Sequence, residues 1–311
     1  MSVDPTPHLI VPFAQCSGDD WLQATSTLPL KTLAQWLSGM KLMDSDNGPT
    51  DSLSPPHERV LAKALGLSTI ADGLIPWAAL EANARPDEAW AVITPCHWAM
   101  GREHATLTDP AALNLTEAES RTLLGAMQPY FATEGITLHF AHPTRWLAEG
   151  EVFGSLPTAS LDRVLGRNVD KWLPASKAIK LLQNEMQMLL YTHSVNDERA
   201  ARGQRPVNSF WVSGSGALNQ PASPNPQIKT DTHLMQPAMT NDWAAYAQAW
   251  TQLQAGPMAQ LLDQQKSGHT VRVSLCGESR AMTFETTKYG FLTQFKRVFG
   301  LQPPINLLKQ L

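Results

Sequence analysis

Short apolar runs that alternate with helical stretches are the feature that most limits the fold of this chain. The run HLIVPFA, residues 8–14, is continuous, as expected for a strand buried on both faces of a mostly parallel sheet. Residues 89–94 and 136–140 predict further strands, and residues 271–275 alternate as a strand does. Amphipathic helical segments lie between these runs, so the sequence predicts an α/β fold.

Local residue chemistry predicts where several helices begin. Thr116 and Glu119 have capping-box spacing ahead of an amphipathic segment. Ser54 is expected to be an N-cap, with Pro55 at the first helical position. Residues 176–192 form the strongest helical pattern, because their apolar side chains recur on one face.

The bulk composition excludes some partners. The chain has 311 residues with 24 basic and 28 acidic side chains, so its charge does not favour nucleic acid. No apolar run approaches the roughly 20 residues of a membrane helix, and the N-terminus lacks the basic start and longer apolar run of a signal peptide. Three scattered cysteines without a CxxC motif fit a reducing compartment. We therefore expect a cytoplasmic protein without nucleic-acid or membrane partners.

Two segments carry candidate polar chemistry. His97 lies in a dense polar cluster at a predicted strand end, where it could bind a ligand or simply be hydrogen-bonded. Asp231, His233 and Asp242 follow residues 217–229, a Pro/Asn-rich predicted linker or surface loop, and are an alternative divalent-metal set. The alternative interpretation is that these three residues lie near one another in the sequence by chance.

A glycine pair follows the predicted strand at residues 207–212. Gly214-Ser215-Gly216 begins like a dinucleotide-binding fingerprint, but Asn219 stands where the third glycine belongs. The glycines are therefore expected to form a turn that leaves the strand.

Arginines are the other candidate ligand contacts. Five of them are considered as an anion site: Arg163, Arg167, Arg199, Arg202 and Arg205. The planar guanidinium group binds two oxygens of a phosphate or carboxylate at once. Pairing with Asp197 and Glu198 on a solvated surface is the competing interpretation.

The order of several phrases resembles a known family. The chain contains GRNVDKWLP (166–174), then a helical segment, then HSVNDERAARG (193–203) and PVNSFWVSGSG (206–216). This order resembles the archaeal-type cofactor-independent phosphoglycerate mutases of the alkaline phosphatase superfamily. The phrases NEMQMLLY and VNSFW also resemble proteobacterial regulatory proteins of the pathogenicity-factor E (RpfE) type.

The resemblance implies an alkaline-phosphatase-like mixed sheet, with helices on both faces and an inserted α/β lobe. Residues 1–84 and 217–311 would form the core, and residues 85–216 the substrate-covering lobe. The two ends of the chain would then contribute neighbouring strands, residues 8–14 and 271–275, to one sheet.

The chain departs from the family where the chemistry lies. Phe13 or Ala14 falls at the place of a metal-binding aspartate, and residues 275–278 (LCGE) replace a phrase that supplies two more ligands. His57 falls near the place of the nucleophilic serine, with Ser54 just upstream. The family's reaction uses two divalent ions, so we expect that this chain has lost it.

Three functions follow as expectations. The first is a non-catalytic regulatory protein without a cofactor, which binds a small phosphorylated or carboxylated ligand or a protein partner. The second is a phosphomutase or phosphohydrolase with a rebuilt site that uses Ser54 or His57 and the alternative metal set. The third is a structural subunit of a complex.

Overall fold

The structure is a computed structural model that describes residues 6–67, 71–220, 225–286 and 303–311. The chain divides into two compact units. The first unit comprises Met1–Asp51, Pro55–Gly66 and Pro224–Leu311, and the second comprises Ser52–Ser54 and Leu67–Ser223. Lys288, Lys296 and Arg297, the most basic stretch of the sequence, lie outside the described residues.

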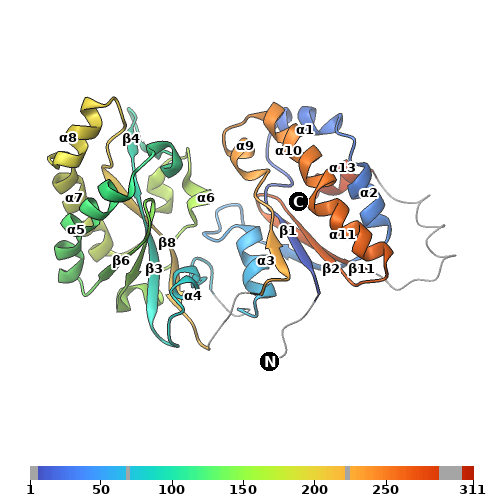
Figure 1. The fold of residues 1–311 in the computed structure, drawn as a ribbon, viewed down its shortest axis with the longest axis horizontal. Coiled ribbons are helices and arrows are strands. Elements are labelled where there is room, and N and C mark those ends of the chain that lie inside the picture. Colours follow the sequence, from blue (N-terminus) through green and yellow to red (C-terminus); the bar gives the residue numbers. More distant parts are fainter. Residues whose placement is uncertain (1–5, 68–70, 221–224, 287–302) are drawn as a thin grey trace. The chain divides into compact units, whose positions relative to one another are not determined.

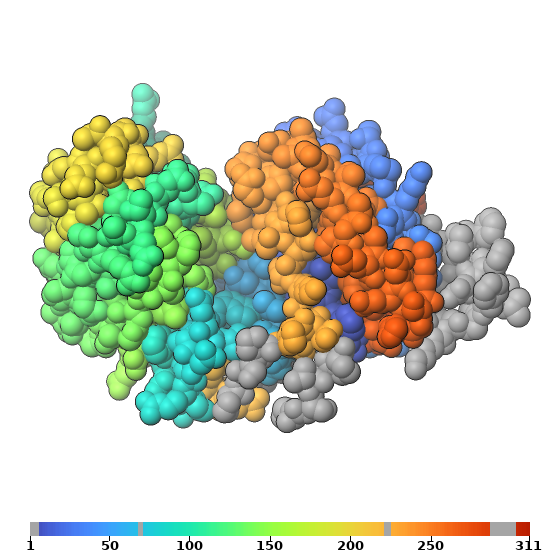
Figure 2. Space-filling model, in the orientation of Figure 1, coloured from blue at the N-terminus to red at the C-terminus, as the bar shows by residue number. Residues whose placement is uncertain are grey.

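The first unit contains a five-stranded mixed sheet in the order β2-β11-β10-β1-β9 (Figure 1). Its strands are β1 (His8–Val11), β2 (Met40–Asn47), β9 (Ile228–Thr230), β10 (Arg272–Cys276) and β11 (Arg280–Thr286). β1 lies between β9 and β10 and is parallel to both, whereas β11 and β2 are antiparallel. The parallel register from His8↔Arg272 to Val11↔Leu275 confirms that the two ends of the chain share one sheet. Figure 2 shows the blue and orange segments of this unit packed together.

Helices cover both faces of this sheet. They are α1 (Asp19–Ser26), α2 (Lys31–Ser38), α3 (Pro56–Ala64), α9 (Met235–Met239), α10 (Trp243–Ala255), α11 (Pro257–Lys266) and α13 (Pro304–Leu308). Leu9 and Val11 of β1 point into a core that α1, α2, α10 and α11 share. Ile10, between them, points to the other face and packs with Val60 of α3. The alternation of side chains along a strand therefore explains why every residue of β1 is buried.

The second unit contains a four-stranded antiparallel sheet in the order β6-β7-β3-β8. Its strands are β3 (Ala89–Cys96), β6 (Thr137–His142), β7 (Arg145–Glu149) and β8 (Ser209–Ala217), and β4 (Trp98–Met100) and β5 (Ala105–Leu107) form a separate hairpin. The helices are α4 (Trp77–Glu81), α5 (Glu117–Thr133), α6 (Leu161–Val164), α7 (Lys177–Tyr191) and α8 (Ser194–Ala201). Residues of α5, α7 and α8 share one core with the sheet, and Ala78 of α4 packs with Val92 and Leu147.

The observed division of the chain differs from the predicted one at residues 52–54, 67–84 and 217–223, which belong to the second unit. For residues 67–84 the reason is that α4 packs against β3 and β8. Of the predicted linker, residues 221–224 lie outside the described residues, while β8 ends at Ala217 and β9 begins at Ile228. None of the described helices is long and apolar enough to cross a membrane.

The structure confirms the predicted start of α5 but not the predicted cap of α3. Thr116 and Glu119 form the predicted capping box of α5. Ser54, however, does not cap α3, whose N-cap is Pro55 without a side-chain bond. The Ser54 hydroxyl instead accepts a hydrogen bond from the Gly73 backbone N–H at 3.0 Å, which holds a loop of the second unit.

The predicted glycine turn is also wrong. Gly214, Ser215 and Gly216 lie inside β8, which continues to Ala217. Gly214 and Gly216 have φ values of 58° and 142°. A Cβ atom on Gly216 would lie 2.7 Å from the Leu74 carbonyl oxygen. The glycines therefore let the strand continue where another segment approaches its backbone closely.

We predict that Gly216→Ala destabilises the second unit by more than about 1 kcal/mol, because it adds a backbone clash to an unfavourable φ. Gly125→Ala is the matched control: Gly125 lies within α5 and a Cβ there meets nothing within 4 Å. It is expected to stabilise by about 0.5–1 kcal/mol. Urea unfolding measures both changes, and an unchanged midpoint for Gly216→Ala would contradict the close approach.

Candidate functional site

The carboxyl ends of the parallel strands define a candidate site in the first unit. Because β9, β1 and β10 run in the same direction, their ends meet at one edge of the sheet. Ligands of open α/β sheets bind outside this edge. Phe13, Asp231 and Glu278 follow the three strands there. We call this place the carboxyl edge.

A strained turn follows β1 at the carboxyl edge. Phe13 has a φ of 55°, which ends the strand at Val11 instead of the predicted residue 14. The Tyr246 hydroxyl donates to the Phe13 carbonyl at 2.7 Å, and the Trp21 indole N–H donates to the Tyr246 oxygen at 3.1 Å. Burial raises the pKa of Tyr246, so the hydroxyl keeps its proton for this bond. The turn is thus held by a buried hydrogen-bond chain and presents an aromatic ring instead of a carboxylate.

An aspartate–histidine pair follows β9. Asp231 is buried, and its Oδ1 accepts hydrogen bonds from His233 Nδ1 at 2.8 Å and from the His233 backbone N–H at 3.1 Å. The His233 side chain is half exposed. When Nδ1 donates in this bond, Nε2 remains available as a proton acceptor or metal ligand.

The third member of the predicted metal set does not join this pair. Asp242 is exposed and caps α10, where its Oδ1 accepts from the Ala245 backbone N–H at 3.0 Å. Among the described residues, Asp231, His233 and Asp242 do not form a group of three close metal donors. The alternative metal set is therefore reduced to two members.

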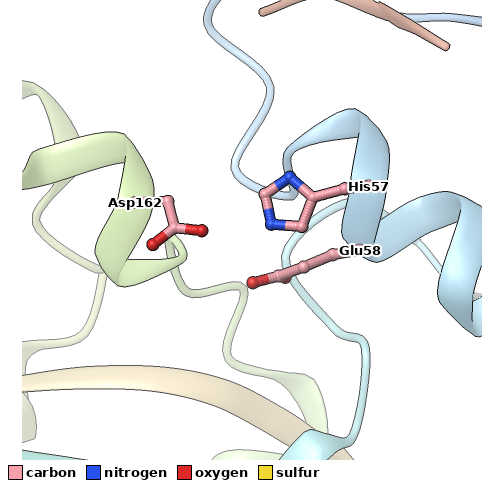
Figure 3. A group of neighbouring side chains, drawn as sticks. All are labelled: His57, Glu58 and Asp162. Carbon is pink, nitrogen blue, oxygen red and sulfur yellow. The ribbon is translucent and has the colours of Figure 1, made fainter. Parts of the chain in front are cut away.

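A second histidine–carboxylate pair lies on α3. His57 is buried in the first turn of this helix, and its ring centroid is 6.0 Å from that of Phe13. A ligand atom of His57 lies within 4.8 Å of one of Glu58, and both side chains project from the helix start (Figure 3). The sequence analysis did not single out Glu58. Its signal was the phrase Pro-His-Glu, which places two potential donors side by side at the start of a helix.

The end of β10 carries little of the ligand chemistry that the resemblance would require. Cys276 is fully buried, and burial raises the pKa of its thiol. Glu278 accepts a hydrogen bond from the Ser17 hydroxyl at 2.6 Å. Of residues 275–278, Glu278 is therefore the only side chain suited to a hard cation.

Arg199, in the second unit, has a structural role that the sequence did not reveal. Its side chain is fully buried, and Nη1 lies 3.1 Å from Glu119 Oε2. Nη2 donates to the Leu113 carbonyl at 2.6 Å, and Nε donates to the Arg205 carbonyl at 2.8 Å. The expected surface pairing with Asp197 or Glu198 is not what holds this guanidinium. Arg199 instead links three segments inside the unit, with no donor directed to solvent.

Glu119 is the acceptor at which two arginines converge. Its Oε1 also accepts from Nη2 of Arg202, whose side chain is half exposed. Burial alone raises the pKa of Glu119, but hydrogen bonds from the Thr116 backbone and hydroxyl and the Arg199 charge outweigh it, so the pKa is lowered. The capping-box carboxylate is therefore charged and shared between the helix start and the two guanidinium groups.

The other predicted ligand contacts lie in different settings. Arg163 is buried and donates from Nη2 to the Ser52 hydroxyl at 2.8 Å, whereas Arg167 and Arg205 are exposed. His97 Nδ1 lies 2.9 Å from the Pro206 carbonyl, as expected for a hydrogen-bonded histidine at a strand end. The structure therefore brings Arg199 and Arg202 together, and ligand binding by these side chains stays a prediction.

Part of the chain is similar in sequence to known phosphoglycerate mutases. The chain is 27% identical over 119 residues to the 2,3-bisphosphoglycerate-independent phosphoglycerate mutase of Methanosarcina mazei, and 24% identical over 120 residues to that of Methanosarcina barkeri. Each match covers 37% of this chain and 30% of the relative, so it spans less than a third of the curated relatives. No family model matches the chain.

Two solved structures are similar to the chain at low identity. The cofactor-independent phosphoglycerate mutase of Thermoplasma acidophilum is similar with a TM-score of 0.35 and 12% identity, over 98% of both chains. The PH0037 protein of Pyrococcus horikoshii is similar with a TM-score of 0.46 and 9% identity, over 94% of this chain and 92% of that one.

We predict that Arg199→Met lowers the free energy of unfolding by about 3–5 kcal/mol, because it removes one partner of a buried ion pair. Glu117→Gln is the control, because it removes a nearby charge on the surface of α5. Glu117 is exposed and pairs with Arg121, and an exposed ion pair of this kind contributes about 0–1 kcal/mol to stability. Urea unfolding distinguishes the two. Equal changes in the free energy of unfolding would show that the buried network does not stabilise the second unit.

Glu119 also makes stability depend on pH. Its folded pKa lies below the ordinary value of 4.5, so its contribution is present above about that pH and is lost as the pH falls through the folded pKa. We expect the Tm of Glu119→Gln to be lower than that of the wild type at neutral pH and to fall less in acid. Thermal unfolding between pH 7 and 3 tests this, and parallel curves would contradict it.

Proposed function

We propose that this chain is a non-catalytic relative of the cofactor-independent phosphoglycerate mutases that binds a small phosphorylated or carboxylated ligand and acts as a regulatory protein. The observation that carries the proposal is the turn at Phe13. It places an aromatic ring where the resemblance implies a metal-binding carboxylate, in a backbone conformation that the Tyr246 hydroxyl stabilises.

The neighbouring strand end supports the loss of metal chemistry. The Ala14 backbone N–H donates to the Cys276 carbonyl at 2.8 Å, so the residues after β1 and the end of β10 are packed together. Both side chains are fully buried, and Ala14 has no ligand atom. Transfer of a phosphoryl group through a serine and two divalent ions needs carboxylates at such positions.

The proposed ligand contacts are the arginines at the end of α8. Arg205 is exposed, and Arg202 presents half of its side chain to solvent. The carboxyl end of a helix favours cations, so anion binding there depends on the guanidinium groups. One good contact between a guanidinium and an anion contributes on the order of 1.5–3 kcal/mol. The regulatory role follows from the resemblance of the same region to RpfE-type proteins.

A rebuilt catalytic site is the second candidate, and the Asp231–His233 pair favours it. A buried carboxylate that orients an exposed imidazole is an arrangement suited to a general base or a metal ligand. His57 and Glu58 add two further donors in the same unit. The second candidate function is therefore a phosphomutase or phosphohydrolase that uses these residues.

We predict that phosphorylated and carboxylated acids raise the Tm of the wild type, and that Arg205→Ala weakens their binding about tenfold, which corresponds to about 1.4 kcal/mol. Arg205→Ala is expected to leave the Tm without ligand almost unchanged, because the Arg205 side chain is exposed. Arg202→Ala is expected to lower the affinity and also the Tm, since it loses the Glu119 bond.

Arg85→Ala is the matched control for the anion measurement. Arg85 is an exposed arginine of the same unit that pairs with Glu88. Its removal should not change the ligand-induced shift. A screen with 3-phosphoglycerate, 2-phosphoglycerate and inorganic phosphate in which no acid shifts the wild type, or in which all variants respond equally, would overturn the anion site.

We also predict no interconversion of 3- and 2-phosphoglycerate and no hydrolysis of phosphate monoesters, with or without added Mn²⁺ or Mg²⁺. Product analysis by ³¹P NMR measures both reactions. Metal-dependent turnover that disappears in His233→Asn and in His57→Asn would establish the rebuilt catalytic site instead. Arg85→Ala serves as the control variant, because Arg85 lies in the other unit and is not one of the proposed ligand contacts.

A further inference from the structure

Helix α7 has an apolar stripe that faces the core and a second, exposed stripe that is apolar at three of its four positions. Ile179, Leu182, Met186 and Leu190 are buried in the second unit. The second stripe consists of Leu181, Asn184, Met188 and Tyr191, which are all exposed. Met188 and Tyr191 expose 76% and 85% of their surfaces. The separations of three, four and three residues are those of a helix-pairing seam.

A groove of about 470 Å³ continues this second stripe toward the β4–β5 hairpin. Its lining includes Trp98, Met100, Leu190, Tyr191, Ala200 and Pro206. Met100, at the end of β4, is 79% exposed. Exposed side chains of this size around an apolar depression are characteristic of an interaction surface.

Opposite charges lie at the two ends of the second stripe. Lys177 and Lys180 are exposed near the start of α7. Asp197 and Glu198 are exposed on α8, just beyond the end of α7. None of these four side chains takes part in an ion pair within the described part of the chain.

We propose that this surface pairs with a second copy of the chain, with the two α7 helices antiparallel across a two-fold axis. In that arrangement Leu181 of one copy lies opposite Tyr191 of the other, and Asn184 lies opposite Met188. The pairing is reciprocal, so the same contacts form twice, as a two-fold interface requires. The axis passes beside the middle of the helix, close to Gln187.

The charges select a second copy over an unrelated helix. Turning α7 end for end brings Lys177 and Lys180 of one copy to the α8 end of the other, where Asp197 and Glu198 lie. A parallel pair would instead place like charges together at both ends, which is unfavourable. The antiparallel arrangement also sets the positive end of each helix dipole beside the negative end of the other.

A cysteine cross-link tests this geometry. Leu181 and Tyr191 are ten residues apart on one helix, or roughly 15 Å, and a disulfide needs Cα atoms about 4.4–6.8 Å apart. The double variant Leu181→Cys/Tyr191→Cys therefore cannot bridge within one α7 but is expected to give a covalent dimer under mild oxidation. Each single variant is the control and should remain largely uncross-linked. The three native cysteines are buried.

Sedimentation analysis of the chain without introduced cysteines provides the second test. The wild type is expected to be a concentration-dependent dimer, and Met188→Glu should weaken it at least about tenfold. The matched control is Leu42→Glu, which changes an exposed leucine of β2 in the first unit. Both variants should keep the wild-type Tm measured at a concentration where the chain is monomeric.

Charge reversal tests the orientation. Lys177→Glu/Lys180→Glu should weaken the dimer, and adding Asp197→Lys/Glu198→Lys should restore it, because the complementarity is then rebuilt in reverse. A wild type that stays monomeric at all soluble concentrations would overturn the proposal. So would a dimer that is unaffected by Met188→Glu, or a double cysteine variant that cross-links no better than the single variants.

Discussion

The parallel pairing of β1 with β10 is the contact on which the first unit depends. It joins the two ends of the sequence, and Ile10 on one face and Leu9 and Val11 on the other require helices on both sides. Because β9 is parallel to β1 as well, three strand ends meet at the carboxyl edge. The location of Asp231, His233 and the Phe13 turn follows from that single topological fact, since a parallel sheet gathers its strand ends at one edge.

The second unit contains a buried charge network beside its apolar core. Glu119 ends up between Arg199 and Arg202, and Arg199 reaches the carbonyl groups of Leu113 and Arg205. A buried pair of this kind is costly to desolvate and strongly destabilising to break, because either partner alone would be a charge in the core. It therefore specifies how α5, α8 and the loop after Arg202 fit together. Of the two arginines that meet at Glu119, Arg199 is therefore internal scaffolding, whereas Arg202 is half exposed.

Much of the fold was predictable, and the candidate site was predictable only in part. The strands with apolar or alternating patterns and the capping box at Thr116 are local signals, and the structure contains them. The glycine turn and the Ser54 cap failed because the deciding neighbour is distant in sequence: Leu74 lies against Gly216, and Gly73 donates to Ser54. The Asp231–His233 pair could be suspected from its spacing of two residues, whereas the role of Asp242 as a helix cap depended on the exact start of α10.

The sequence by itself determined the α/β class, the strand that each end contributes, and the absence of a carboxylate at residues 13 and 14, because these depend on residue type and on periodicity. The tertiary structure alone decided that Arg199 is buried, that Phe13 adopts a left-handed backbone under the Tyr246 hydroxyl, and that Tyr191 and Met188 remain uncovered. The physical reason is that burial, desolvation and hydrogen-bond partners come from segments far apart in the chain. An arginine or a tyrosine has the same local preferences in the core and at the surface, and only its neighbours in space assign it to one or the other.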